Sequence, residues 1–104
     1  MIMEDNKSAS ELVLTERTKQ KSGKYILNFD KRVNHQGNLM IASKGILEEP
    51  LEYREMSRPC NWNMYKWNGY CRRSLKERLI LSASFLCAEY DRLESIEKDQ
   101  NEDV

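Results

Sequence analysis

The stretch that decides the fold is "SLKERLILSASFLCAEYDRLESIEKD", residues 74–99, which contains no Gly or Pro. Its first four residues form a capping box, in which the Ser74 hydroxyl can accept from the amide of Glu77 and the Glu77 carboxylate can reach back. Large side chains follow at spacings of four, seven, four and three residues, as one stripe of a helix: Leu75, Leu79, Leu86, Tyr90 and Leu93. The sequence therefore predicts a long C-terminal helix that covers the rest of the fold.

The middle of this helix is apolar on nearly every side between residues 79 and 88. A helix that is apolar all round has to be buried on more than one side. We expect a sheet to cover one side, while the second is covered either by region 46–72 of the same chain or by another protein chain. In the second case a homodimer forms through a face that contains Ile80, Leu81 and Phe85.

Three upstream segments alternate apolar and polar residues with a period of two, which is typical of β-strands. They are "ELVLTERT", "YILNFDKRV" and "LMIASKGIL", at residues 11–18, 25–33 and 39–47. Residues 51 and 53 add a short edge strand after Pro50. We therefore expect an α+β fold, a three-stranded antiparallel meander packed against one long C-terminal helix, with an aromatic-rich connector between them.

The length of 104 residues predicts one domain. We expect a flexible N-terminus at 1–10, a single α+β domain at 11–97 and an acidic flexible tail at 98–104. The net charge is zero, but blocks 17–44 and 58–78 are basic and the segments around them are acidic. The folded surface is therefore either polarised, or its neighbouring blocks neutralise one another.

The chain shows no sign of a membrane segment or a secretory signal. No run approaches the roughly 20 apolar residues that a bilayer span needs, and the start "MIMEDNKSAS" lacks a basic region followed by an apolar one. Three widely spaced cysteines do not form a disulfide framework. We expect a cytoplasmic protein.

Aromatic, basic and cysteine side chains are concentrated in the connector, in "PCNWNMYKWNGYCRR" at residues 59–73. Asn68-Gly69 is a strong type I′ turn signal and predicts a small hairpin, while a short helical turn through Trp62 and Tyr65 is the alternative. The aromatic and basic side chains of this segment are the candidate partner-binding residues: Trp62, Tyr65, Lys66, Trp67, Tyr70, Arg72 and Arg73.

The sequence gives little indication of a metal site or of a catalytic site. Zinc sites use paired Cys or His ligands a few residues apart, whereas Cys60 and Cys71 are eleven apart and His35 is the only histidine. Nearby arginines could lower a cysteine pKa, but nucleophilic catalysis also needs a positioned base. We expect no enzyme, no cofactor and no metal.

The connector instead indicates binding. Trp, Tyr and Arg dominate the energetics of protein interfaces, which predicts a small non-enzymatic interaction module, a regulatory or inhibitory accessory protein that binds a larger protein partner. The alternative is a single-stranded nucleic-acid or RNA-binding protein, in which the aromatic and basic segment 58–78 stacks bases and binds phosphates. The zero net charge disfavours nucleic acid, because such domains are usually basic.

Overall fold

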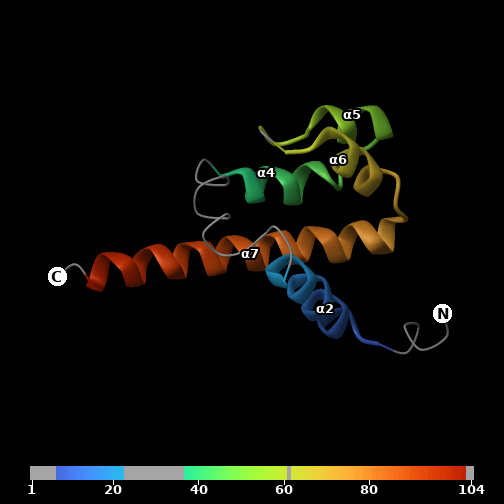
Figure 1. The fold of residues 1–104 in the computed structure, drawn as a ribbon. Helices are drawn as coiled ribbons and strands as arrows, with labels where there is room; N and C mark the ends of the chain where they lie inside the picture. The colour runs from blue at the N-terminus through green and yellow to red at the C-terminus, as the bar shows by residue number, and fades with distance from the viewer. Residues whose placement is uncertain (1–6, 23–36, 61, 103–104) are drawn as a thin grey trace.

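A computed structural model describes residues 7–22, 37–60 and 62–102. Its regular elements are the helices α2 (Ala9–Ser22), α4 (Asn38–Gly45), α5 (Leu51–Met56), α6 (Met64–Cys71) and α7 (Leu75–Glu102). The long helix α7 is the axis of the molecule, and α4 and α2 both pack against it (Figure 1). Helices α5 and α6 pack against each other and lie beyond α4, above the N-terminal half of α7.

The predicted α+β fold is wrong, because the described part of the chain contains helices and no strand. Residues 11–18 lie within α2, and residues 39–45 lie within α4. The expected edge strand after Pro50 is the helix α5. The predicted strand at 25–33 lies outside the described residues.

Helix α2 begins at a second capping box. The Ser8 hydroxyl oxygen accepts from the amide of Glu11 at 3.3 Å and donates to the Glu11 carboxylate at 3.2 Å. Along the helix, buried or half-buried side chains recur every three or four residues, at Val13, Arg17 and Gln20. The inward face of this segment therefore has a helical period, although Leu12 to Thr15 also fit a period of two.

The inward face of helix α4 includes the small residues Ala42 and Ser43. Among its buried positions, Leu39, Ala42 and Ser43, with Ile46 just after the helix, have the spacing of one helix face, and Asn38 and Gly45 are buried as well. At its C-terminal end the helix approaches the backbone after α5 closely, since a Cβ on Gly45 would lie 2.6 Å from the Cβ of Ser57. Glycine at position 45 is therefore required for this contact.

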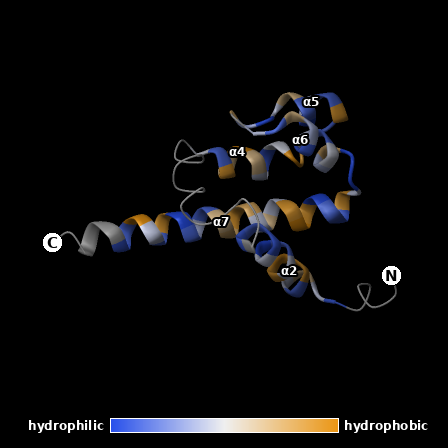
Figure 2. Cartoon of the chain, in the orientation of Figure 1, coloured by the Kyte–Doolittle hydropathy of each residue, from blue (hydrophilic) through white to orange (hydrophobic). Residues whose placement is uncertain are grey.

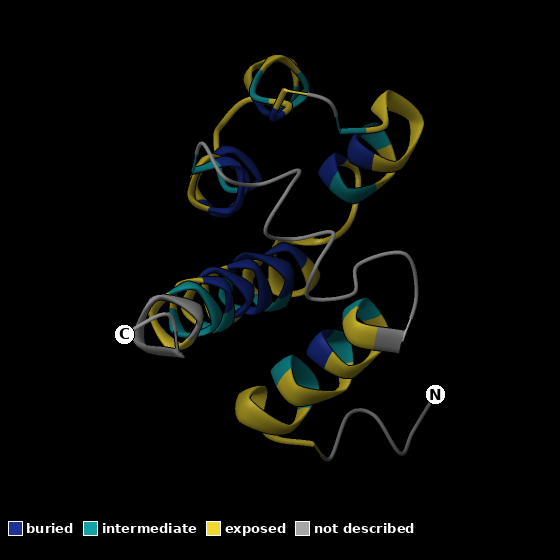
Figure 3. Cartoon of the chain, turned by 60° about the vertical axis from the view of Figure 1, so that its left-hand side comes forward, coloured by how far each residue is buried: buried dark blue, intermediate teal, exposed yellow. Residues whose placement is uncertain are grey.

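The prediction of a long C-terminal helix is confirmed, but the orientation of its faces is reversed. The amide of Glu77 donates to the Ser74 hydroxyl oxygen at 3.2 Å, and α7 continues to Glu102. The side chains of the predicted inward stripe are exposed, at 45–65% of their surface: Leu75, Leu79, Leu86, Tyr90 and Leu93. The buried stretch of α7, dark blue in Figure 3, lies between α4 and α2 and includes Leu81, Phe85 and Ala88.

The hydrophobic core lies between α4, α6 and α7. Its buried members are Leu39, Ala42, Ile46, Trp67, Cys71, Leu81, Phe85 and Ala88. Small polar residues allow the helices to approach closely on both sides of α7. Ser82 donates to the carbonyl oxygen of Ser43 in α4 at 2.7 Å, and Gln20 of α2 donates to the Ser84 hydroxyl at 3.0 Å.

Two buried arginines join the helix ends through main-chain carbonyl oxygens. Arg54 donates to the carbonyl oxygens of Cys71 at 3.0 Å and Glu48 at 2.7 Å. Arg78 donates to the carbonyl oxygens at positions 46 and 73, both at 3.1 Å. The carboxylate of Glu49 lies 3.0 Å from the first guanidinium and 3.5 Å from the second. These contacts satisfy carbonyl groups that the helix ends leave without partners inside the helix.

Candidate functional site

The aromatic connector folds as a helix and not as a hairpin. Asn63 caps α6, because its side-chain oxygen accepts from the amide of Lys66 at 2.9 Å. The predicted turn dipeptide Asn68-Gly69 lies inside this helix. Glycine costs a helix roughly 1 kcal/mol relative to alanine, and the burial of Trp67 one turn before Cys71 offsets that cost.

Three of the four candidate aromatics form a packed cluster with Phe85 of α7. Trp67 is fully buried, and its indole N–H donates to the carbonyl oxygen of Arg54 at 2.9 Å. The Trp62 ring is edge-on to Trp67 at 5.9 Å and to Phe85 at 5.3 Å. The ring of Tyr70 lies 6.2 Å from that of Phe85. These rings therefore contact one another and do not form a common exposed platform on which bases could stack.

The remaining candidates lie at the surface. Tyr65 is 80% exposed, and Lys66 beside it is exposed as well. The Arg73 guanidinium lies over the Tyr70 ring, 5.1 Å from its centroid. Arg72 forms an exposed ion pair of 3.4 Å with Glu55 of α5. The structure therefore separates the candidate set into aromatic rings that pack around Phe85 and an exposed remainder, of which Arg72 contacts α5.

The face considered for a homodimer is mostly interior. Leu81 and Phe85 are buried in the core and Ile80 is half-buried. A contact through these residues would require the core to open.

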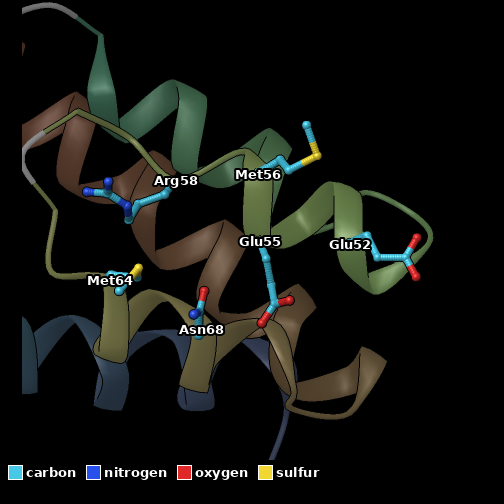
Figure 4. Close-up of a pocket in the computed structure, with 6 residues that line it drawn as sticks. All are labelled: Glu52, Glu55, Met56, Arg58, Met64 and Asn68. Carbon is cyan, nitrogen blue, oxygen red and sulfur yellow. The ribbon is translucent and has the colours of Figure 1, made fainter.

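A groove of about 520 Å³ lies between α5 and α6 (Figure 4). Its lining residues are Glu52, Glu55, Met56, Arg58, Met64 and Asn68. Met56, at the end of α5, is 80% exposed, and Met64, at the start of α6, is 50% exposed. Sequence reasoning missed Met56 because segment 45–59 has no clean period. It also missed Met64, although this residue lies within the aromatic connector, between Trp62 and Tyr65.

The three cysteines differ in exposure. Burial, with a smaller contribution from the Glu55 carboxylate, raises the pKa of the Cys71 thiol to about 11, while neighbouring arginines act in the opposite direction. Cys71 is therefore a protonated, unreactive thiol at neutral pH. Cys60 and Cys87 are exposed.

The described residues 7–22, 37–60 and 62–102 contain no group of three or more His, Cys, Asp or Glu that could hold a metal ion. None of the helices described combines the length and the hydropathy that a bilayer crossing needs. Comparison of the chain with protein-family models, curated proteins and solved structures gave no match.

Proposed function

We propose that this chain is a non-enzymatic protein-interaction module that binds a protein partner through the α5–α6 groove. The observation that carries the proposal is the exposure of Met56 and Met64 on this groove. Tyr65, the next residue of α6 after Met64, is 80% exposed. Methionine is flexible and polarisable, so methionine-rich surfaces adapt well to the side chains of a partner. Tyr65 adds a rigid aromatic ring of the kind that dominates interface energies.

The charges around the groove indicate which partner segment fits. Glu52 and Glu55 line the α5 side, and Arg58 lies toward the start of α6 (Figure 4). An amphipathic helix would place its apolar face on the methionines and a Lys or Arg near the two carboxylates. The existing ion pair between Arg72 and Glu55 is exposed, so a partner's arginine could replace it at little cost.

The test compares affinity capture by the wild-type chain with capture by the double variant Met56→Ser/Tyr65→Ser. Both side chains are 80% exposed, so the double variant is expected to keep its fold. We expect it to lose a partner that the wild type retains, with a dissociation constant raised at least about tenfold when the purified partner is titrated.

A matched control is Leu14→Ser on α2, which also removes an exposed apolar side chain but lies on another helix. This control should bind the partner as the wild type does. Equal loss of binding in the control and in the double variant, or no loss in either, contradicts the assignment to the groove.

A further inference from the structure

Between Leu79 and Leu93 the exposed residues of α7 are almost all apolar, although the outer face of a surface helix is normally polar. Figure 2 shows hydrophobic segments recurring along this helix. From Leu79 to Leu93, four exposed residues and the half-buried Ala83 follow one another at spacings of four, three, four and three. We call these residues the α7 seam: Leu79, Ala83, Leu86, Tyr90 and Leu93. This alternation of three and four is the pattern by which two helices form a coiled coil.

The charges at the two ends of the seam have opposite signs. Near its N-terminal end, Lys76 is exposed three residues before Leu79, while the exposed Glu77 lies one position further round the helix. Near its C-terminal end lie the carboxylates of Glu94, which is half-buried, and Glu97, which is exposed. Within the part of the chain that the structure describes, no ion pair involves Lys76, Glu94 or Glu97. A second helix of the same sequence therefore complements this seam when it runs antiparallel, and repels it when it runs parallel.

We infer that the α7 seam binds a second copy of this chain in the antiparallel direction. One register places Ala83 against Leu86 of the second copy, a small residue against a large one. The same register places Leu79 against Tyr90 of the second copy, and Lys76 beside Glu94. This surface is separate from the α5–α6 groove and does not depend on the function proposed for that groove.

The arrangement of the helices agrees with this direction. Helices α4, α5 and α6 lie over the N-terminal half of α7, and the C-terminal half extends beyond them (Figure 1). In an antiparallel pair, the stacked helices of each copy lie beside the extended half of the other. In a parallel pair both stacks would lie at the same end, together with the Lys76 side chains of both copies.

Sedimentation equilibrium of the full chain tests the inference. The wild type is expected to have a mass of about 25 kDa, twice 12.3 kDa, at a concentration of about 100 μM, and to dissociate on dilution. Leu86→Glu places two carboxylates in the centre of the seam and should raise the dissociation constant at least about 100-fold. The helix content in circular dichroism should stay unchanged, because this side chain is exposed in the protomer. Leu14→Glu, the same change on the exposed face of α2, should leave the dimer intact.

A charge exchange tests the direction. Lys76→Glu should weaken the dimer roughly three- to tenfold by removing two symmetric ion pairs at the edge of the seam, and adding Glu94→Lys to the same chain should restore it. A parallel seam would show no such restoration, and that result overturns the inferred direction. If Leu86→Glu proves to be unfolded, the charge exchange still tests whether the α7 seam forms the dimer.

Two results overturn the inference as a whole. One is a wild-type mass of 12.3 kDa at every concentration, which is the result if another protein or another segment of this chain covers the seam. The other is a folded Leu86→Glu variant that still forms dimers, because the interface would then lie elsewhere.

Discussion

Replacing Arg54 with methionine is expected to destabilise the fold much more than the same change at Arg72. Methionine keeps much of the length and apolar volume of the arginine stem and removes the guanidinium. At Arg54 this removes the hydrogen bonds to the carbonyl oxygens of Cys71 and Glu48, at 3.0 and 2.7 Å, and the contact with Glu49. The Glu49 side chain is 68% exposed, so losing that contact adds little.

The magnitude follows from the two carbonyl groups, of which the Cys71 bond is buried and the Glu48 bond is half-buried. A buried polar group that loses its partner costs about 1–3 kcal/mol, and bonds from charged donors lie at the upper end of that range. We therefore expect Arg54→Met to lower the free energy of unfolding by about 3 kcal/mol. That corresponds to a fall of roughly 15 °C in Tm for a domain of this size. Arg72→Met removes one ion pair from a side chain that is 67% exposed, and should cost less than about 1 kcal/mol.

The assay is urea unfolding at one fixed protein concentration, followed by tryptophan fluorescence, since the Trp67 indole is fully buried in the folded chain. Equal m-values in the two variants would show that the same surface is exposed on unfolding. A loss below about 1 kcal/mol for Arg54→Met, or equal losses in both variants, would refute the reasoning that these buried bonds hold the helix ends together.

Two further predictions concern the start of α7 and the thiols. Ser74→Ala should lower the free energy of unfolding by about 1 kcal/mol in a urea titration, because the amide of Glu77 loses its acceptor; a cost as high as that of a core truncation would show a larger role. With a thiol reagent at pH 7.5, mass spectrometry should find Cys60 and Cys87 modified while Cys71 is protected, since it is buried and its pKa is about 11. Rapid modification of Cys71 in folded protein would contradict its placement in the core.

The Cys71 thiol also gives the fold a pH dependence with a definite sign. Its pKa in the folded chain, about 11, lies above its ordinary value of 9.0, so the unfolded chain ionises first. Stability is therefore unaffected by this group below about pH 8 and falls as the pH rises between these two pKa values.

How much of this fold can be predicted depends on the sequence signals that each helix carries. Helix α7 was predictable because a capping box precedes a long run without Gly or Pro. Helix α2 has a capping box too, at Ser8 and Glu11, but Leu12 to Thr15 also fit the period of a strand. In α4 the inward face contains Ala42 and Ser43, so a search for large apolar residues selects a different set.

The orientation of α7 could not be predicted, because both of its sides are apolar. A periodic pattern shows which residues share a face but not which of two apolar faces lies inside. The structure places the small residues Ser82, Ser84 and Ala88 inward, where α2 and α4 approach closely, and leaves large leucines outside. The sequence therefore predicts that the exposed stripe from Leu75 to Leu93 faces the core. It also predicts a dimer contact through Leu81 and Phe85, which the structure places in the core.

The candidate site was predictable only in its general position. The connector does supply exposed residues, Tyr65 and Lys66, and one wall of the groove. The fully buried Trp67 and the helical Asn68-Gly69 depend on tertiary contacts with α5 and α7, which outweigh the local turn preference. No local pattern indicates that an arginine will bond to carbonyl oxygens 17 or 32 positions away along the chain, as Arg54 and Arg78 do.

The hydrogen bonds of Arg54 and Arg78 also determine at which positions a side chain can be replaced without loss of these bonds. Their acceptors are main-chain oxygens at positions 46, 48, 71 and 73, which every amino acid supplies. At the solvent-exposed acceptor positions 48 and 73, a change of side chain leaves the bond itself in place. These four hydrogen bonds thus tolerate side-chain changes at the exposed acceptor positions, whereas on the donor side they depend on the guanidinium groups of Arg54 and Arg78.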